Sequence, residues 1–114
     1  MAQTLQRQII AVALTLIEDE EHWTRGAIAR TADRHPCAWN DPGAVRFCAV
    51  GALVRAAYDL VGNEGQAREL AIRAARQIAA ASNRQRGVLP YINDCEGHVA
   101  TMAMFKRTLA SVAD

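Results

Sequence analysis

The sequence has few aromatic residues, few prolines and almost no lysine. Six of its 114 residues are Phe, Trp or Tyr, three are proline, and a single lysine stands beside twelve arginines. Thirteen basic and twelve acidic side chains leave a net charge of +1, so the whole chain exerts no strong attraction on phosphate or anionic lipid. This composition excludes a disordered chain, a collagen and a strongly basic nucleic-acid binder.

Cysteine and long apolar runs are scarce as well. The three cysteines cannot all pair within one chain, and none stands in a Cys-x-x-Cys spacing. The apolar run at 9–17 has nine residues, whereas a membrane span needs about 20. The acidic residues at 18–21 follow this run where a signal peptide would have small residues. We therefore expect a cytoplasmic protein with reduced thiols and no membrane span.

Alanine is abundant, with 23 residues, and 51% of the chain is hydrophobic. A chain of this length buries enough surface for one core without disulfides or metals. The absence of a convincing strand pattern, together with helical spacing of apolar residues, predicts an all-α fold. We expect residues 1–114 to form a single helical domain, a compact bundle of four main helices.

The first helix is expected over 3–20, where Leu5, Ile9, Val12 and Leu16 recur on one face. The next stretch, 24–40, is ambiguous. It favours irregular structure with one short helix starting at Thr24. The alternative is a small extended ribbon formed by residues 27–29 and 37–39.

Capping residues predict the other three helices. Asp41, followed by Pro42, is typical of a helix start, and this helix is expected to run to Val61 and end at Gly62. It carries few charges, which is typical of a buried central helix. Asn63 and Asn93 each begin a capping box, which places the remaining helices after Asn63 and at about 94–112, with 84–90 as a loop.

Three stretches together resemble a known family. Residues 22–27 (HWTRGA), 44–53 (AVRFCAVGAL) and 91–94 (YIND) are similar to the motifs of a small bacterial and phage helical domain family of unknown function. Its most distinctive features are a helix with an aromatic-Cys-x-x-Gly-Ala-Leu pattern and a later Asn-Asp motif. The resemblance covers roughly residues 5–110 and implies a fold but no activity. Among the cysteines, only Cys48 falls on the pattern.

Cys48 and His98 are the candidate catalytic pair, with Asp94 or Asn93 to orient the imidazole. A thiol nucleophile needs a base to form the thiolate and a third group to hold that base. Such a site would make the chain a thiol hydrolase or transferase. The competing interpretation is structural: Cys48 lies in a very apolar stretch, where burial makes a thiol inert, His98 lies on an apolar seam, and Asn93 caps a helix.

A metal site is the second possibility. Cys95-x-x-His98 and His35-x-Cys37 have the spacing of zinc ligands, but they are not the paired Cys-x-x-Cys pattern of structural zinc sites. We therefore expect no bound metal and no cofactor.

The sequence favours a binding module over an enzyme. Most of the unusual polar and aromatic residues fall in two segments, 35–42 and 93–98, which we expect to converge. The candidate binding residues there are Trp39, Asp41, Asn93, Asp94 and His98. The partner would be another protein or a small ligand, and the alanine-rich helix faces would also suit a second copy of the chain.

A nucleic-acid surface is the last alternative. Arg73, Arg76 and Arg84 concentrate positive charge on one helix, and Arg86 follows in the loop. Aromatic residues do not alternate with these arginines, and no helix-turn-helix pattern is evident. A solvated arginine face is the simpler interpretation, so nucleic acid is not the expected partner.

Overall fold

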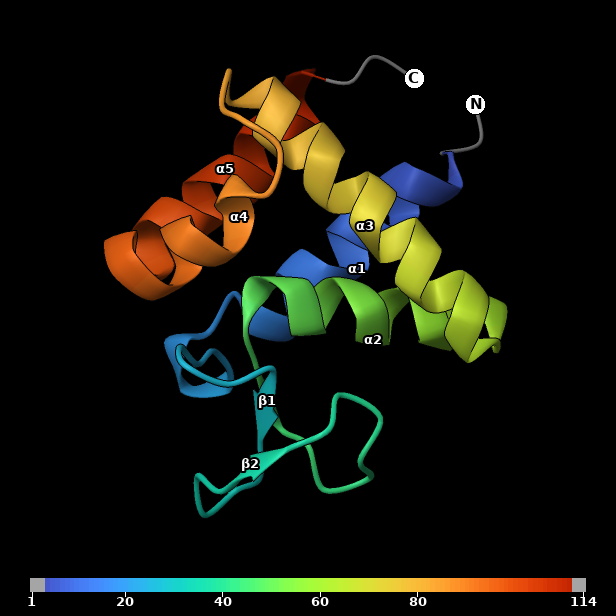
Figure 1. The fold of residues 1–114 in the computed structure, drawn as a ribbon, viewed down its shortest axis with the longest axis vertical. Helices are drawn as coiled ribbons and strands as arrows, with labels where there is room; N and C mark the ends of the chain where they lie inside the picture. Colours follow the sequence, from blue (N-terminus) through green and yellow to red (C-terminus); the bar gives the residue numbers. More distant parts are fainter. Residues whose placement is uncertain (1–3, 112–114) are drawn as a thin grey trace.

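A computed structural model describes residues 4–111 (Figure 1). The helices are α1 (Leu5–Ile17), α2 (Ala49–Val61), α3 (Glu64–Ala81), α4 (Val88–Tyr91) and α5 (His98–Ser111). A short 3-10 helix covers Glu20–His22, and a π-helical turn, here called the 92–96 turn, covers Ile92–Glu96. The strands are β1 (Ala29–Arg30), β2 (Pro36–Cys37) and β3 (Arg46–Phe47). Figure 1 shows the helices gathered together, with the small sheet at one end of the molecule.

The fold is mainly helical, as predicted, but it also contains a three-stranded antiparallel sheet in the order β2-β1-β3. The favoured short helix within 24–40 is wrong, and the extended ribbon is the better description. Ala29 pairs with Cys37 on one side and with Phe47 on the other. Pairing on both edges of β1 satisfies backbone groups that a short isolated helix would leave to water.

The predicted start of the central helix is also wrong. Asp41 does not cap it, because the Asp41 carboxylate accepts the N–H of Gly43 at 2.7 Å in a local turn. The chain then continues as β3, and α2 begins only at Ala49, with Cys48 at the N-cap position. The pairing of β3 with β1 explains why α2 begins later in the sequence than predicted, because a residue in a strand cannot also be helical.

The last helix begins later than its capping box predicts. Asn93 does not cap α5; it lies in the 92–96 turn, which closes with a bond from the Gly97 N–H to the Ile92 carbonyl at 3.0 Å. Gly97 has φ +97°, a backbone conformation that favours glycine, and the chain changes direction there before α5. The loop expected at 84–90 likewise gives way to the short helix α4.

Other helix boundaries confirm the sequence prediction. The Asn63 side chain accepts the N–H of Gln66 at 2.8 Å and caps α3. Gly62, with φ +71°, ends α2. Helix α1 falls within the expected 3–20, and residue 3 lies outside the described part. In α5, Met102 and Phe105 are buried, and the expected end of this helix near residue 112 lies outside the described residues.

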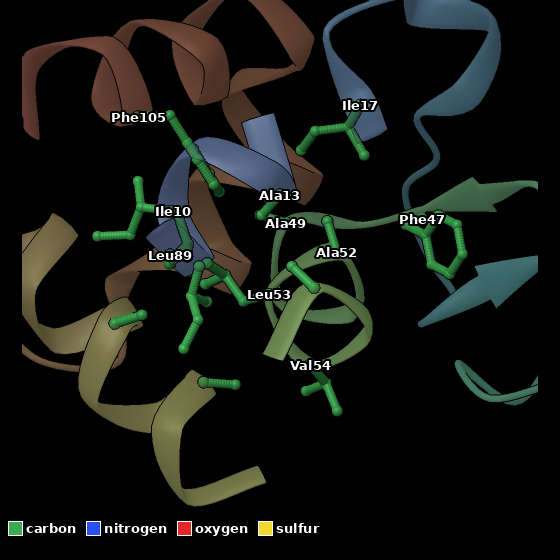
Figure 2. Packing of buried hydrophobic residues seen from close by; sticks show 14 of the residues in the cluster. Ile10, Ala13, Ile17, Phe47, Ala49, Ala52, Leu53, Val54, Leu89 and Phe105 are labelled. Carbon is green, nitrogen blue, oxygen red and sulfur yellow. The ribbon is translucent and has the colours of Figure 1, made fainter. Parts of the chain in front are cut away.

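Alanines account for the close packing of α2 and α3. Eight of them on these two helices are at most 2% exposed: Ala49, Ala52, Ala56, Ala57, Ala67, Ala71, Ala74 and Ala79. Small side chains let neighbouring helices approach closely. The larger residues Ile10, Leu53, Leu89 and Phe105, from α1, α2, α4 and α5, form one buried cluster with the first seven of these alanines (Figure 2). Within residues 4–111 no helix is long and apolar enough to cross a membrane.

Candidate functional site

Asn93 joins three separate parts of the chain. Its Oδ1 atom accepts hydrogen bonds from Trp23 Nε1 at 2.7 Å and from the Ala49 N–H at 2.9 Å. Its Nδ2 atom donates to the Thr24 carbonyl at 3.1 Å and to Asp94 Oδ1 at 2.9 Å. The side chain is buried, and both lone pairs and both amide hydrogens have a partner. We call Trp23, Thr24, Ala49, Asn93 and Asp94 the Asn93 junction.

The junction caps α2 from a distance. Ala49 is the first residue of α2, and its N–H would have no partner within the helix. Asn93 supplies that partner, and the Cys48 sulfur accepts the N–H of Gly51 at 3.3 Å. Two acceptors, one local and one 44 residues away, therefore satisfy the start of this buried helix.

Cys48 is a helix cap with a protonated thiol. Burial has the largest effect and raises the pKa of this thiol; the backbone N–H groups of Gly51 and Val50 lower it by less, and the Asp94 carboxylate raises it slightly further. A raised pKa leaves little thiolate at neutral pH. The environment of Cys48 is therefore the opposite of the one that activates a nucleophilic cysteine.

His98 is held by other partners. Its Nε2 atom lies 2.7 Å from the Ile17 carbonyl oxygen, and its ring lies against Trp23 with 5.3 Å between the ring centroids. Because a carbonyl oxygen only accepts, Nε2 carries the proton. Among the described residues, 4–111, no hydrogen bond joins His98 to Cys48 or to Asp94.

The structure does bring Cys48, Asn93 and Asp94 to one place. They line a pocket of about 240 Å³, here called the Cys48 pocket, together with Ala27, Ile28, Val50 and Pro90. His98 is not among the residues that line it. Asp94 Oδ1 is occupied by Asn93 and by the Gly26 N–H at 3.2 Å.

Trp39 and Asp41 lie away from the Asn93 junction. Trp39 is buried against Tyr58, with 5.4 Å between ring centroids, near the end of α2. The junction sits at the opposite end of this helix. Nine residues separate Ala49 from Tyr58, which is about 13 Å along a helix axis. The expected convergence of 35–42 with Asn93 and Asp94 therefore does not form.

The residues considered for zinc are also dispersed. His35 Nδ1 lies 3.0 Å from Asp33 Oδ2 in an exposed loop, Cys37 is part of β2, and Cys95 is exposed. Within residues 4–111, no group of three or more His, Cys, Asp or Glu side chains is arranged to hold a metal ion.

A larger groove lies between α2 and α3, and sequence reasoning missed it. It has a volume of about 580 Å³ and is lined mainly by small and apolar residues, here called the α2–α3 groove. Its lining residues are Val50, Val54, Arg68, Ala71, Ile72, Ala75, Arg76, Arg86, Gly87 and Pro90. Ile72 is 52% exposed, an unusual exposure for a large aliphatic side chain on an otherwise well-packed helix.

Three arginines stand along this groove. Arg68, Ile72 and Arg76 are four residues apart, so they form one stripe on α3, and Arg86 approaches from the loop before α4. Across residues 4–111, none of the three guanidinium groups has a carboxylate or hydrogen-bond partner. By contrast, Arg84 pairs with Glu96 at 3.6 Å, and Arg55 pairs with Asp59, one turn along α2, at 3.5 Å.

The three arginines considered for nucleic acid are in three different environments. Arg73 lines a separate depression beside Leu5 and Val61, Arg76 lines the α2–α3 groove, and Arg84 is paired. The signal that would have revealed the groove is the four-residue spacing of Arg68, Ile72 and Arg76 beside the small residues of α3.

The family comparison covers nearly the whole chain. The model of a family described as "Family of unknown function (DUF6197)" matches residues 1–111. The chain belongs to DUF6197. This confirms the resemblance to a family of unknown function, while a bacterial or phage origin is not part of the match. The comparisons of this DUF6197 member with curated proteins and with solved structures gave no match.

Proposed function

We propose that this DUF6197 chain is a binding module that seats a small ligand with an apolar body in the α2–α3 groove. The observation that carries the proposal is the groove itself, a concave surface of about 580 Å³ lined mainly by apolar atoms of α2, α3 and the segment before α4. Sites for small molecules are typically concave, mostly apolar and about 300–1,000 Å³ in volume. An exposed apolar surface that binds nothing is energetically unfavourable for a free protein, because contact between water and apolar atoms raises the free energy.

The frame of the groove is well suited to binding. Both of its long walls are helices, and α2 is fixed at its start by the Asn93 junction and the Cys48 cap. Sites built on packed helices hold their shape better than sites built on loops. The ligand would therefore meet a largely preformed surface.

The groove continues toward the residues that the sequence singled out. Val50 and Pro90 line both the α2–α3 groove and the Cys48 pocket. A ligand longer than the groove would extend past these two residues to Asp94 and Cys48. Under this proposal Trp39 and His98 support the frame and do not touch the ligand.

A thiol enzyme is less well supported by the same geometry. Cys48 has a raised pKa, and its sulfur caps a helix, while the proton-bearing Nε2 of His98 faces a carbonyl. Nucleophilic catalysis by cysteine needs a lowered thiol pKa or an adjacent base.

The experiment is a titration with a neutral solvatochromic dye, Nile red, whose fluorescence rises in apolar surroundings. We expect saturable binding to the wild-type protein. Ala75→Trp fills the groove from α3, and we expect it to weaken dye binding by about tenfold or more, since the indole occupies the ligand's space. Ala103→Trp is the matched control, because Ala103 is exposed on α5 and does not line the groove.

Two results would contradict the proposal. One is the absence of saturable dye binding to the wild-type protein. The other is equal binding to the wild type and Ala75→Trp, provided that circular dichroism shows both variants to be folded.

A further inference from the structure

We infer that the ligand of the α2–α3 groove is an amphipathic anion, with an apolar body and one carboxylate or phosphate head. This inference rests on the proposed function and specifies its ligand class. The groove supplies two kinds of surface: apolar side chains, of which Val54 and Ala71 are buried, and three exposed arginines whose guanidinium groups have no partner among residues 4–111. An amphipathic anion matches both, whereas a neutral or cationic ligand matches only the first.

The positions of the arginines support an anionic head. Arg68 and Arg76 lie two helical turns apart on one stripe of α3, on either side of Ile72, and Arg86 enters from a different segment. Because none of these guanidinium groups has a carboxylate partner among residues 4–111, an anion bound in the groove would gain charge-assisted hydrogen bonds without displacing an existing ion pair. The planar guanidinium group also matches carboxylate and phosphate geometry better than any other side chain.

The groove has no competing acid. None of its lining residues is Asp or Glu, and Asp94 is the one acidic residue among those that line the adjoining Cys48 pocket. This arrangement would reject a cationic ligand and accept an anionic one. The charge of the groove is local, because the whole chain carries only +1.

A small molecule fits the groove better than a nucleic acid. No aromatic side chain lines it, so bases would have no stacking surface. The volume also falls in the range of small-molecule sites. We therefore commit to a free amphipathic molecule, and binding to a lipid surface becomes an outcome of the test.

The test compares four probes that share a ten-carbon chain: decanoate, decyl phosphate, decanol and decyltrimethylammonium. Isothermal titration below the critical micelle concentration measures each dissociation constant. We expect decanoate or decyl phosphate to bind at least about tenfold more tightly than decanol, and the cation to bind most weakly. The tighter of the two anions identifies the head group as carboxylate or phosphate.

Variants that remove the positive charge of the groove arginines test whether these side chains cause the preference for an anion. We expect Arg68→Gln/Arg76→Gln to reduce the preference for the anion over decanol to less than about threefold, because a neutral amide no longer attracts the anionic head. Arg73→Gln is the matched control, because Arg73 is on the same helix but lines a different depression. It should retain the full preference.

The outcomes separate the two proposals. Equal binding of decanoate and decanol, with saturable Nile red binding, would overturn the anionic ligand and leave the binding module standing. Failure of every probe, including Nile red, would overturn both. Sedimentation with phosphatidylglycerol vesicles in the absence of any binding to monomeric decanoate or decyl phosphate would also overturn the inference, since the arginines would then recognise a surface.

Discussion

Cys48 occupies the N-cap position of α2, where Ser, Thr, Asp or Asn is usual. A sulfur acceptor is a weak replacement for oxygen, and the Asn93 amide adds a stronger acceptor for the neighbouring Ala49 N–H. The sequence places Cys48 correctly in an apolar environment. It does not reveal the capping role, because that role depends on a strand ending immediately before the helix.

The raised pKa of Cys48 has a consequence for its reactivity. With the other two cysteines replaced by Ser, we expect iodoacetamide to alkylate Cys48 at neutral pH at least about tenfold more slowly than it alkylates Cys95 in the matching variant that keeps only Cys95, because Cys95 is exposed. Mass spectrometry measures both rates. Fast and saturable alkylation of folded Cys48 would instead support the thiol-enzyme alternative.

The raised pKa of the Cys48 thiol also makes the stability of the protein depend on pH. The folded protein holds the Cys48 proton more tightly than the unfolded chain, because burial raises the pKa of this thiol. Its contribution to stability is therefore fully present below the pKa of an unfolded cysteine. This contribution is lost as the pH rises from that value through the higher pKa of the folded state.

Helix α2 illustrates the competition between helix and strand. Asp41, Pro42 and Gly43 have the residue types of a helix start, yet they form a turn that returns the chain to the sheet. The residue types at 41–43 suit a helix start and a turn equally well, so the pairing of β3 with β1 determines which of the two forms. The caps at Gly62 and Asn63 were predictable because both depend on neighbours within four residues.

Gly51 lies where the residue before β1, Ile28, packs against α2. A Cβ atom on Gly51 would overlap the backbone carbonyl oxygen of Ile28, which also accepts the Cys48 N–H at 3.2 Å. Backbone cannot move aside as cheaply as a flexible side chain. We therefore expect Gly51→Ala to lower the free energy of unfolding by about 2 kcal/mol or more, as measured by urea denaturation.

Gly65→Ala is the matched control for this substitution. Gly65 is exposed in the first turn of α3, and a Cβ there would meet only Asn63 Oδ1 at 3.5 Å, an ordinary contact. We expect it to raise the free energy of unfolding by up to about 1 kcal/mol, since alanine favours helix. Equal destabilisation by both substitutions would contradict the close approach at Gly51.

Across the whole molecule, the helical framework was predictable and its assembly was not. Apolar periodicity and local caps identify the main helices, because those signals repeat within a few residues. The sheet, the Asn93 junction and the α2–α3 groove arise from segments far apart in the chain. Asn93 lies 70 residues from Trp23, and its local pattern equally fits a simple helix cap.

Asn93→Leu tests whether this amide holds the molecule together. The substitution keeps the number and branching of the side-chain heavy atoms but leaves the Trp23 Nε1, the Ala49 N–H and the Thr24 carbonyl without their partner. We expect the free energy of unfolding to fall by about 3 kcal/mol or more, because these buried donors and the acceptor would lose their hydrogen bonds to water on folding without gaining a partner in the protein. Urea denaturation followed by circular dichroism provides the measurement.

Asn40→Ala is the corresponding control. Asn40 is exposed, and its amide donates one hydrogen bond to Glu64 at 2.9 Å. We expect a change within about 0.5 kcal/mol, as for most surface substitutions. A similarly small change for Asn93→Leu would show that the junction contributes little to stability.

The Asn93 junction also constrains how the protein is made. A ribosome releases the chain from its amino end, so Trp23, Thr24 and Ala49 emerge well before the side chain that joins them. Until residue 93 leaves the exit tunnel, the first turn of α2 and the indole of Trp23 lack this partner. The Asn93 hydrogen bonds that tie the segment before the sheet to the start of α2 therefore form only after residue 93 has left the tunnel, later than the local contacts between Ile28 and α2.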